Sequence, residues 1–171
     1  MPTKVYNNVV EHRLIDNGKV VEDVTSVGVP TLEFQTTPIS VSGMVMDVDM
    51  PDTTHLKAME FTVSHNNGTN CRYLSNPGKH SLETRVARQR YNVTKGENEY
   101  ESVKFRITGL HKSTEKGTIE KGNPYGSTEK YSVLRYEEEI AGVVVTLIDA
   151  TAGIIRWNGK DYTSPVESLL K

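Results

Sequence analysis

The chain has 171 residues, of which 36% are hydrophobic and 25% charged, and its formal net charge is -2. This size and composition predict one globular domain, and the near-neutral charge excludes the basic surplus that sequence-independent nucleic-acid binding requires. No apolar run approaches the about 20 residues of a membrane span, and residues 1–12 lack the apolar segment of a signal peptide. The single cysteine, Cys71, excludes an internal disulfide and a multi-cysteine zinc site.

The first part of the chain is predicted to form short strands. Two strand-like runs within residues 10–27 flank Asn17 and Gly18, which tolerate positive φ, so this segment is typical of a β-hairpin. Prolines then interrupt the pattern, and only a short strand is expected within residues 32–37.

The next segment, residues 41–52, mixes apolar and acidic side chains. Exposed apolar patches usually mark a partner site, and the flexible thioether of methionine adapts to a neighbouring surface. Interleaved aspartates keep such a patch soluble before assembly and can meet lysines on an identical subunit. We therefore predict that this segment is covered by self-association through Met44, Val45, Met46, Asp47, Val48, Asp49, Met50 and Asp52.

The same acids leave an alternative open. Asp47, Asp49 and Asp52 offer oxygen ligands for a hard cation such as calcium. The glycine and the closing glutamate of an EF-hand loop are absent, however, and apolar residues separate the acids. A surface loop with acids for solubility is the plainer interpretation, and no metal or cofactor is expected.

Alternating apolar and polar residues predict half-buried strands in the middle of the chain. One lies within residues 56–65, and the most regular one within residues 100–110. Residues 82–93 fit a helix or a strand, and their β-branched residues and flanking turns favour a strand.

Residues 111–130 contain almost nothing to bury, so we expect a long exposed loop there. Residues 131–162 return to strands, with turns near Gly142 and Gly159. Two short helices are expected. One lies near Cys71 and Leu74, both turned inward, with Thr69 or Asn70 as its cap; the other starts at a Ser164 cap near the C-terminus.

The sequence lacks the motifs of an enzyme. Its five histidines are scattered without metal-ligand spacing, no serine stands in a GxSxG turn, and no glycine pattern cradles a phosphate. No catalytic residue is predicted. Arg85, Arg88 and Arg90 do not share one strand face, and we expect them to pair with the glutamates that follow. The glutamates of residues 137–139 are expected to be solvated or to face an interface.

From about residue 5 to the C-terminus, the order of elements resembles the major tail tube protein of contractile-tailed bacteriophages. Residues 103–122 look like the strand and Lys/Gly/Glu loop of that family, and residues 26–64 look like its strand, long loop and strand. Residues 141–161 are similar to its closing hairpin. The elements of that hairpin that recur here are Gly142, Ile148, Asp149, Ile154, Asn158, Gly159 and Asp161.

The resemblance implies a mainly β fold of two packed antiparallel sheets, a barrel-like sandwich with one or two short helices. Residues 1–8 would be an N-terminal arm, residues 39–57 a long protruding loop that reaches neighbouring subunits, residues 111–130 an exposed loop and residues 164–171 a C-terminal helix or tail. Six subunits would form a ring, and stacked rings would form the hollow tube of a phage tail inside a contractile sheath.

The resemblance also implies the partners. These are further copies of the chain, the tail sheath protein, the tape measure protein, and the baseplate and tail terminator proteins. DNA would pass through the lumen without specific binding, and no membrane is involved. The protein would belong to the virion and, during assembly, to the host cytoplasm. Two alternatives stay open: a tube of a DNA-free contractile device, such as a tail-like bacteriocin or secretion system, and a monomeric β-sandwich module that binds through residues 111–130.

Overall fold

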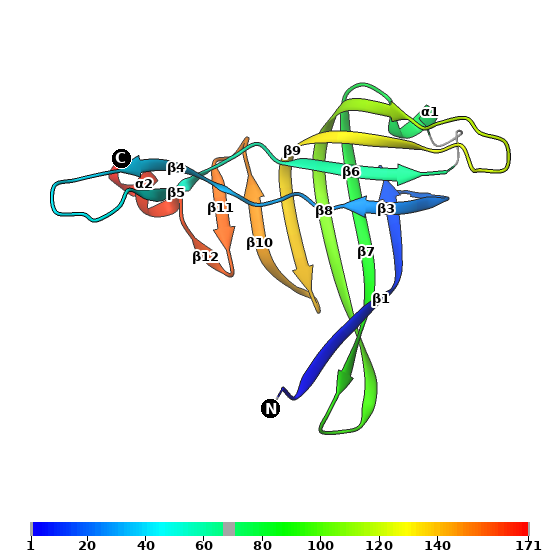
Figure 1. The fold of residues 1–171 in the computed structure, drawn as a ribbon, viewed down its shortest axis with the longest axis horizontal. Coiled ribbons are helices and arrows are strands. Elements are labelled where there is room, and N and C mark those ends of the chain that lie inside the picture. The colour runs from blue at the N-terminus through cyan, green and yellow to red at the C-terminus, as the bar shows by residue number, and fades with distance from the viewer. Residues whose placement is uncertain (1, 67–70, 171) are drawn as a thin grey trace.

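Antiparallel strands make up most of the structure (Figure 1), a computed structural model that describes residues 2–66 and 71–170. In chain order its elements are β1 (Lys4–Asp16), β2 (Lys19–Val21), β3 (Val24–Gly28), β4 (Phe34–Ile39), β5 (Val48–Leu56), β6 (Glu60–His65), α1 (Cys71–Leu74), β7 (Lys79–Asn92), β8 (Glu97–Lys116), β9 (Ser127–Ile140), β10 (Val143–Asp149), β11 (Ile154–Trp157), β12 (Lys160–Asp161) and α2 (Ser164–Leu169). The prediction of a mainly β fold with antiparallel sheets is confirmed.

One branched sheet contains ten of the strands, in the order β12-β11-β10-β9-β8-β7-β1-β2, with β6 and β3 as a side branch. The branch point is β9, whose first half pairs with β6 and whose second half pairs with β10. A register shift opposite Thr108 and Gly109 lies between these halves, and such a bulge bends a strand and increases its twist. The sheet therefore folds over a core and supplies both layers, but it does not close into a barrel.

The core lies between the β3–β6 branch and the long strands. Phe61 and Val63 of β6 are fully buried together with Ile107 of β8. The Phe61 and Tyr131 rings are 6.4 Å apart, and the Tyr131 hydroxyl donates a 2.7 Å hydrogen bond to the carbonyl of Leu74. This bond fixes α1 over one end of the core.

The hairpin turns lie where the sequence predicts them. Asn17 and Gly18 have φ of 48° and 82°, and Asn158 and Gly159 have φ of 49° and 78°. At the β9–β10 turn, Ala141 and Gly142 have similar φ values of 50° and 83°. Two successive residues with positive φ make the turn whose twist matches that of paired strands, which explains the Asn-Gly sequences.

The predicted loop at residues 111–130 is too long. β8 continues to Lys116 and β9 begins at Ser127, so only residues 117–126 connect the two strands. The end of β8 and the start of β9 carry polar side chains that pair across the two strands, such as Glu115 and Lys130, which form a 2.6 Å ion pair. Because these strand ends are polar, their amino-acid composition resembles that of a loop, and this is why the sequence predicts a longer loop than the structure has.

α1 forms where a short helix is predicted, and Leu74 is fully buried. Its predicted caps, Thr69 and Asn70, lie outside the described residues, as does the side chain of Cys71.

α2 begins one residue earlier than predicted, because Ser164 is its first residue and Thr163, not Ser164, is its cap position. The Asp161 carboxylate accepts hydrogen bonds of 3.0 Å from the backbone amides of Thr163 and Ser164. Asp161 therefore satisfies the first amides of the helix. Within residues 2–66 and 71–170, no helix has the length and apolar character that crossing a membrane requires.

Candidate assembly interface

β4 and β5 form a two-stranded ribbon outside the main sheet, which we call the arm. The strands pair from Ile39 opposite Val48 near the tip to Phe34 opposite Leu56 at the base. The Phe34 ring lies 5.3 Å from the Trp157 ring, and Leu56 packs against the core, so the base is anchored. In Figure 1 the arm lies at one end of the long axis of the molecule, the end at which α2 also lies.

The arm tip, residues 40–50, presents apolar side chains to solvent. Val45 is fully exposed, and Met46 and Met50 expose 68% and 51% of their surface. Met44 is also exposed, whereas Val48 is half-buried. A two-stranded ribbon is only marginally stable by itself. The tip therefore gains most from burial against another surface, and its own subunit does not provide that burial.

The acids of the segment have two different roles. Asp52 accepts hydrogen bonds from the backbone amide of Thr54 at 2.9 Å and from its hydroxyl at 2.6 Å, which lowers the pKa of Asp52. Asp52 thus stabilises the arm itself. Asp47 and Asp49 are exposed, and their carboxylates make no hydrogen bond within the described residues. Across residues 2–66 and 71–170, no group of three or more His, Cys, Asp or Glu has a metal-binding arrangement.

In addition to the end strands β2 and β12, the strands β1 and β3 of the main sheet have an open edge. β1 pairs with β7 along its length, but β2 covers only Leu14–Asp16, so residues 4–13 have one edge without a strand partner in the described chain. The expected N-terminal arm, residues 1–8, is largely part of this strand. β3 pairs with β6 and with no other described strand. Open edges offer unpaired backbone groups to another chain.

The sequence does not predict the open edge of β1. Its side chains include the exposed residues Val5, Tyr6, Val9 and Val10. Two register shifts between residues 6 and 11 interrupt the period-two alternation from which strands are recognised. The signal in the sequence for a strand over residues 4–10 is the cluster of valines there.

A network of ion pairs covers one face of β7, β8 and β9. The Arg106 guanidinium lies 3.4 Å from Glu83, 2.5 Å from Glu137 and 2.9 Å from Glu139. Lys104 binds Glu139 at 3.2 Å, and hydrogen bonds from Lys104 and Arg106 lower the pKa of Glu139. Arg85 and Arg135 also bind Glu83 and Glu137. The three carboxylates of this face thus pair with all four of these cations and offset most of their charge, and residues 137–139 are not a simple solvated run.

The opposite face carries a second network, near the β7–β8 turn. Arg88 binds Glu101 at 2.5 Å, and Arg90 binds Glu99 at 3.0 Å and Glu101 at 3.1 Å. A hydrogen bond from Asn92, together with those from the neighbouring cations, lowers the pKa of Glu99 to about 2. The predicted pairing with the following glutamates is confirmed for Arg88 and Arg90, whereas Arg85 pairs with the preceding Glu83 on the other face.

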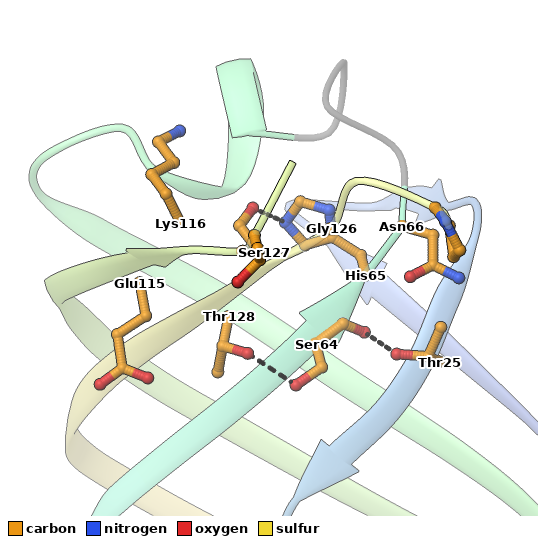
Figure 2. Close-up of a pocket in the computed structure, with 12 residues that line it drawn as sticks. Thr25, Ser64, His65, Asn66, Glu115, Lys116, Gly126, Ser127 and Thr128 are labelled. Carbon is orange, nitrogen blue, oxygen red and sulfur yellow. Dashed lines mark hydrogen bonds between the residues drawn. The ribbon is translucent and has the colours of Figure 1, made fainter. Parts of the chain in front are cut away.

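A buried polar cluster joins β6 to β9 and includes residues of a catalytic type. Figure 2 shows Ser127 beside His65, with a rung between Ser64 and Thr128 below them. The Ser127 hydroxyl lies 3.3 Å from His65 Nε2, and Glu129 lies 3.5 Å from the same nitrogen. A catalytic Ser-His-acid triad uses the two different ring nitrogens. This cluster therefore has another geometry, and it holds the two strands together.

A comparison with known protein families shows the family of this chain. The family model described as phage tail tube protein FII matches residues 11–170. The chain belongs to this family. The predicted resemblance to tail tube proteins is confirmed, and the chain is thus one of a family of structural tail tube proteins. No curated protein matches the sequence.

Solved structures are similar to this tail tube protein in fold. One is a chain of the PVC sheath-tube complex of an extracellular contractile injection system in its extended state. It has a TM-score of 0.53 and 11% sequence identity over 77% of this chain and 90% of that chain. Another, from the baseplate of the anti-feeding prophage (AFP), has a TM-score of 0.45 and 10% identity over 77% and 91%. The first similarity shows a shared fold.

Proposed function

We propose that the protein is the structural subunit of a phage tail tube. Six copies form a ring, and stacked rings form a hollow conduit inside a contractile sheath through which DNA is delivered. The exposed apolar arm tip carries this proposal, because a soluble chain rarely leaves such a patch uncovered. The role is structural, and no enzymatic activity is proposed.

The open strand edges support a repeating assembly. An edge of β1 or β3 that pairs with another copy removes unpaired backbone groups that otherwise promote aggregation. Contacts between different surfaces of identical subunits generate a ring when the rotation closes, and stacking then extends the ring into a tube.

The charge network supports a conduit for DNA. Cations such as Arg106 are already engaged by carboxylates, so this face offers few free charges to phosphates. DNA can then pass without being held. Membership of the tail tube family supports the remaining partners: the sheath outside the tube, the tape measure protein within it during assembly, and the baseplate and terminator proteins at its ends. We further propose that the protein acts in the virion, and in the host cytoplasm during assembly.

A second candidate is the tube of a DNA-free contractile device. This candidate is supported by the fold that the protein shares with a chain of an extracellular contractile injection system. Neighbouring genes separate the two: genes for a capsid and a terminase identify a phage, whereas their absence from a complete tail cluster identifies the DNA-free device.

Negative-stain electron microscopy of the concentrated protein tests the proposal. The wild-type protein should form rings or hollow tubes. Replacing residues 40–47 by Asn-Gly keeps the Ile39–Val48 pair beside a favoured hairpin turn, and this variant should remain folded but fail to assemble. Shortening the connection at residues 117–126 is the control and should leave assembly intact. A wild-type protein that remains monomeric under all these conditions contradicts the proposal and favours a binding module.

A further inference from the structure

A groove lies between β3 and the strands β1, β7 and β8. Its volume is about 420 Å³. Both β1 and β3 have an open edge in the described chain. Most of the groove lining is apolar, from Val9, Val27, Val29, Val86, Val103 and Phe105. The groove is therefore a concave apolar surface flanked by two strands that can accept a further strand.

Two polar atoms of this lining are buried without a hydrogen-bond partner among the described residues: the His12 Nε2 and the Thr84 hydroxyl. Thr84 is only 2% exposed. Because nearly all buried polar groups in native proteins are paired, an occupant that brings a hydrogen-bond acceptor suits this site.

The polar groups of the groove limit the chemistry of its occupant. Arg88 is the charged member of the described lining, and it already binds Glu101 at 2.5 Å, so it does not need a further carboxylate. Arg88 also lies 4.5 Å from the ring of Tyr6 on the open strand β1. The groove therefore suits a ligand with apolar side chains and a hydrogen-bond acceptor for His12 and Thr84, and a carboxylate is one such acceptor.

The arm tip has this combination. Val45 and Met46 supply exposed apolar surface, and methionine adapts its shape to a groove. Asp47 and Asp49 supply carboxylates that no described residue binds. The tip is a narrow two-stranded ribbon, a shape that enters a groove beside an open strand edge.

The tip of a subunit does not face its own groove. In Figure 1 the arm and β3 lie toward opposite ends of the long axis. A contact between tip and groove therefore joins two copies and leaves one tip and one groove free at the ends of every pair. Such a contact repeats from head to tail and produces a ring or an extended polymer.

We propose that the groove between β1 and β3 is the receptor for the arm tip of a second copy. Val45, Met46 and their neighbours pack against the valines of the groove, and an aspartate of the tip accepts hydrogen bonds from His12 and Thr84. This inference rests on the proposed self-assembly of the tube and specifies its contact.

Site-specific cross-linking between differently tagged copies tests the contact. One copy carries Val9→Cys in the groove, and the other carries Val45→Cys at the tip. Both positions are exposed, so the substitutions should leave the fold intact, which thermal unfolding checks. The control replaces the first copy by Val143→Cys, an exposed valine at the β9–β10 turn. A short bismaleimide joins the cysteines after mixing, and mass spectrometry identifies the joined peptides.

The proposal predicts a joined peptide that contains residues 9 and 45, formed at least about tenfold more than one that contains residues 143 and 45. Rings or tubes that form without the 9–45 product, or with both products in equal amounts, overturn the groove as receptor while self-assembly stands. A wild-type protein that remains monomeric in parallel micrographs overturns the assembly proposal and this inference together.

Discussion

Truncation of Met46 to alanine should weaken assembly and leave the stability of the subunit unchanged. Met46 exposes 68% of its surface at the arm tip, so it contributes little packing within its own subunit. Substitutions at exposed positions of this kind usually change the free energy of unfolding by less than about 0.5 kcal/mol. Any larger effect on self-association must then arise between subunits.

The size of that effect follows from the exposed area. Full burial of a methionine side chain is worth about 1.5–3 kcal/mol. Scaled by the 68% of Met46 that is exposed, its burial against a partner contributes about 1–2 kcal/mol at each contact. Because 1.4 kcal/mol corresponds to a tenfold change in affinity, each contact in the Met46→Ala variant should weaken about 5- to 30-fold.

Light scattering and sedimentation measure the concentration at which assembly begins, and urea unfolding of the free subunit measures its stability. Tyr73→Ala is the matched control, because Tyr73 is 60% exposed on α1 rather than on the arm. The control should assemble at the wild-type concentration. The reasoning fails if Met46→Ala also assembles at that concentration, or if it lowers the free energy of unfolding by more than about 1 kcal/mol.

Three further predictions concern the rest of the subunit. Tyr131→Phe leaves the buried carbonyl of Leu74 without its 2.7 Å donor and should lower the free energy of urea unfolding by about 1–3 kcal/mol, whereas an unchanged value contradicts that bond. The pKa of Glu99 in the folded protein is about 2, below its ordinary 4.5, so the stabilisation by ionised Glu99 is present above pH 4.5 and is lost as the pH falls toward 2. In the Glu99→Gln variant, the melting temperature should therefore depend less on pH between 4.5 and 2, and the same dependence as in the wild-type protein argues against this effect. Replacing both Glu137 and Glu139 by glutamine raises the formal net charge from -2 to zero and frees cations such as Arg106. Fluorescence anisotropy at low salt should then detect DNA binding by this variant and not by the wild-type protein, and equal binding by both proteins contradicts the proposal that these glutamates keep the cations from DNA.

The sequence predicts the elements whose signals are local. In β8, Val103 and Ile107 alternate with polar residues, and both are buried as that alternation requires. Asn17 and Gly18 mark a turn by their tolerance of positive φ, which the structure shows at both positions. The exposed apolar tip was also recognisable, because its residues are consecutive in the chain.

Features that depend on distant segments were not predictable from one sequence. No local pattern relates Val9 of β1 to Val27 of β3, although both line one groove. The bulges of β1 interrupt its alternation, so its open edge was not identified. Sheet register brings Arg106 of β8 to Glu137 of β9, and only the pairing of two long strands determines that register.

Oxidation of methionine before and after assembly tests most directly whether the arm tip is covered by a second copy. Met46 and Met50 are exposed in the subunit, whereas Met59 is 8% exposed and serves as an internal reference. The account predicts rapid oxidation of Met46 and Met50 by dilute peroxide in the free subunit and at least about tenfold slower oxidation in rings or tubes, with Met59 slow in both. Equal oxidation rates for Met46 in free and assembled protein would contradict it.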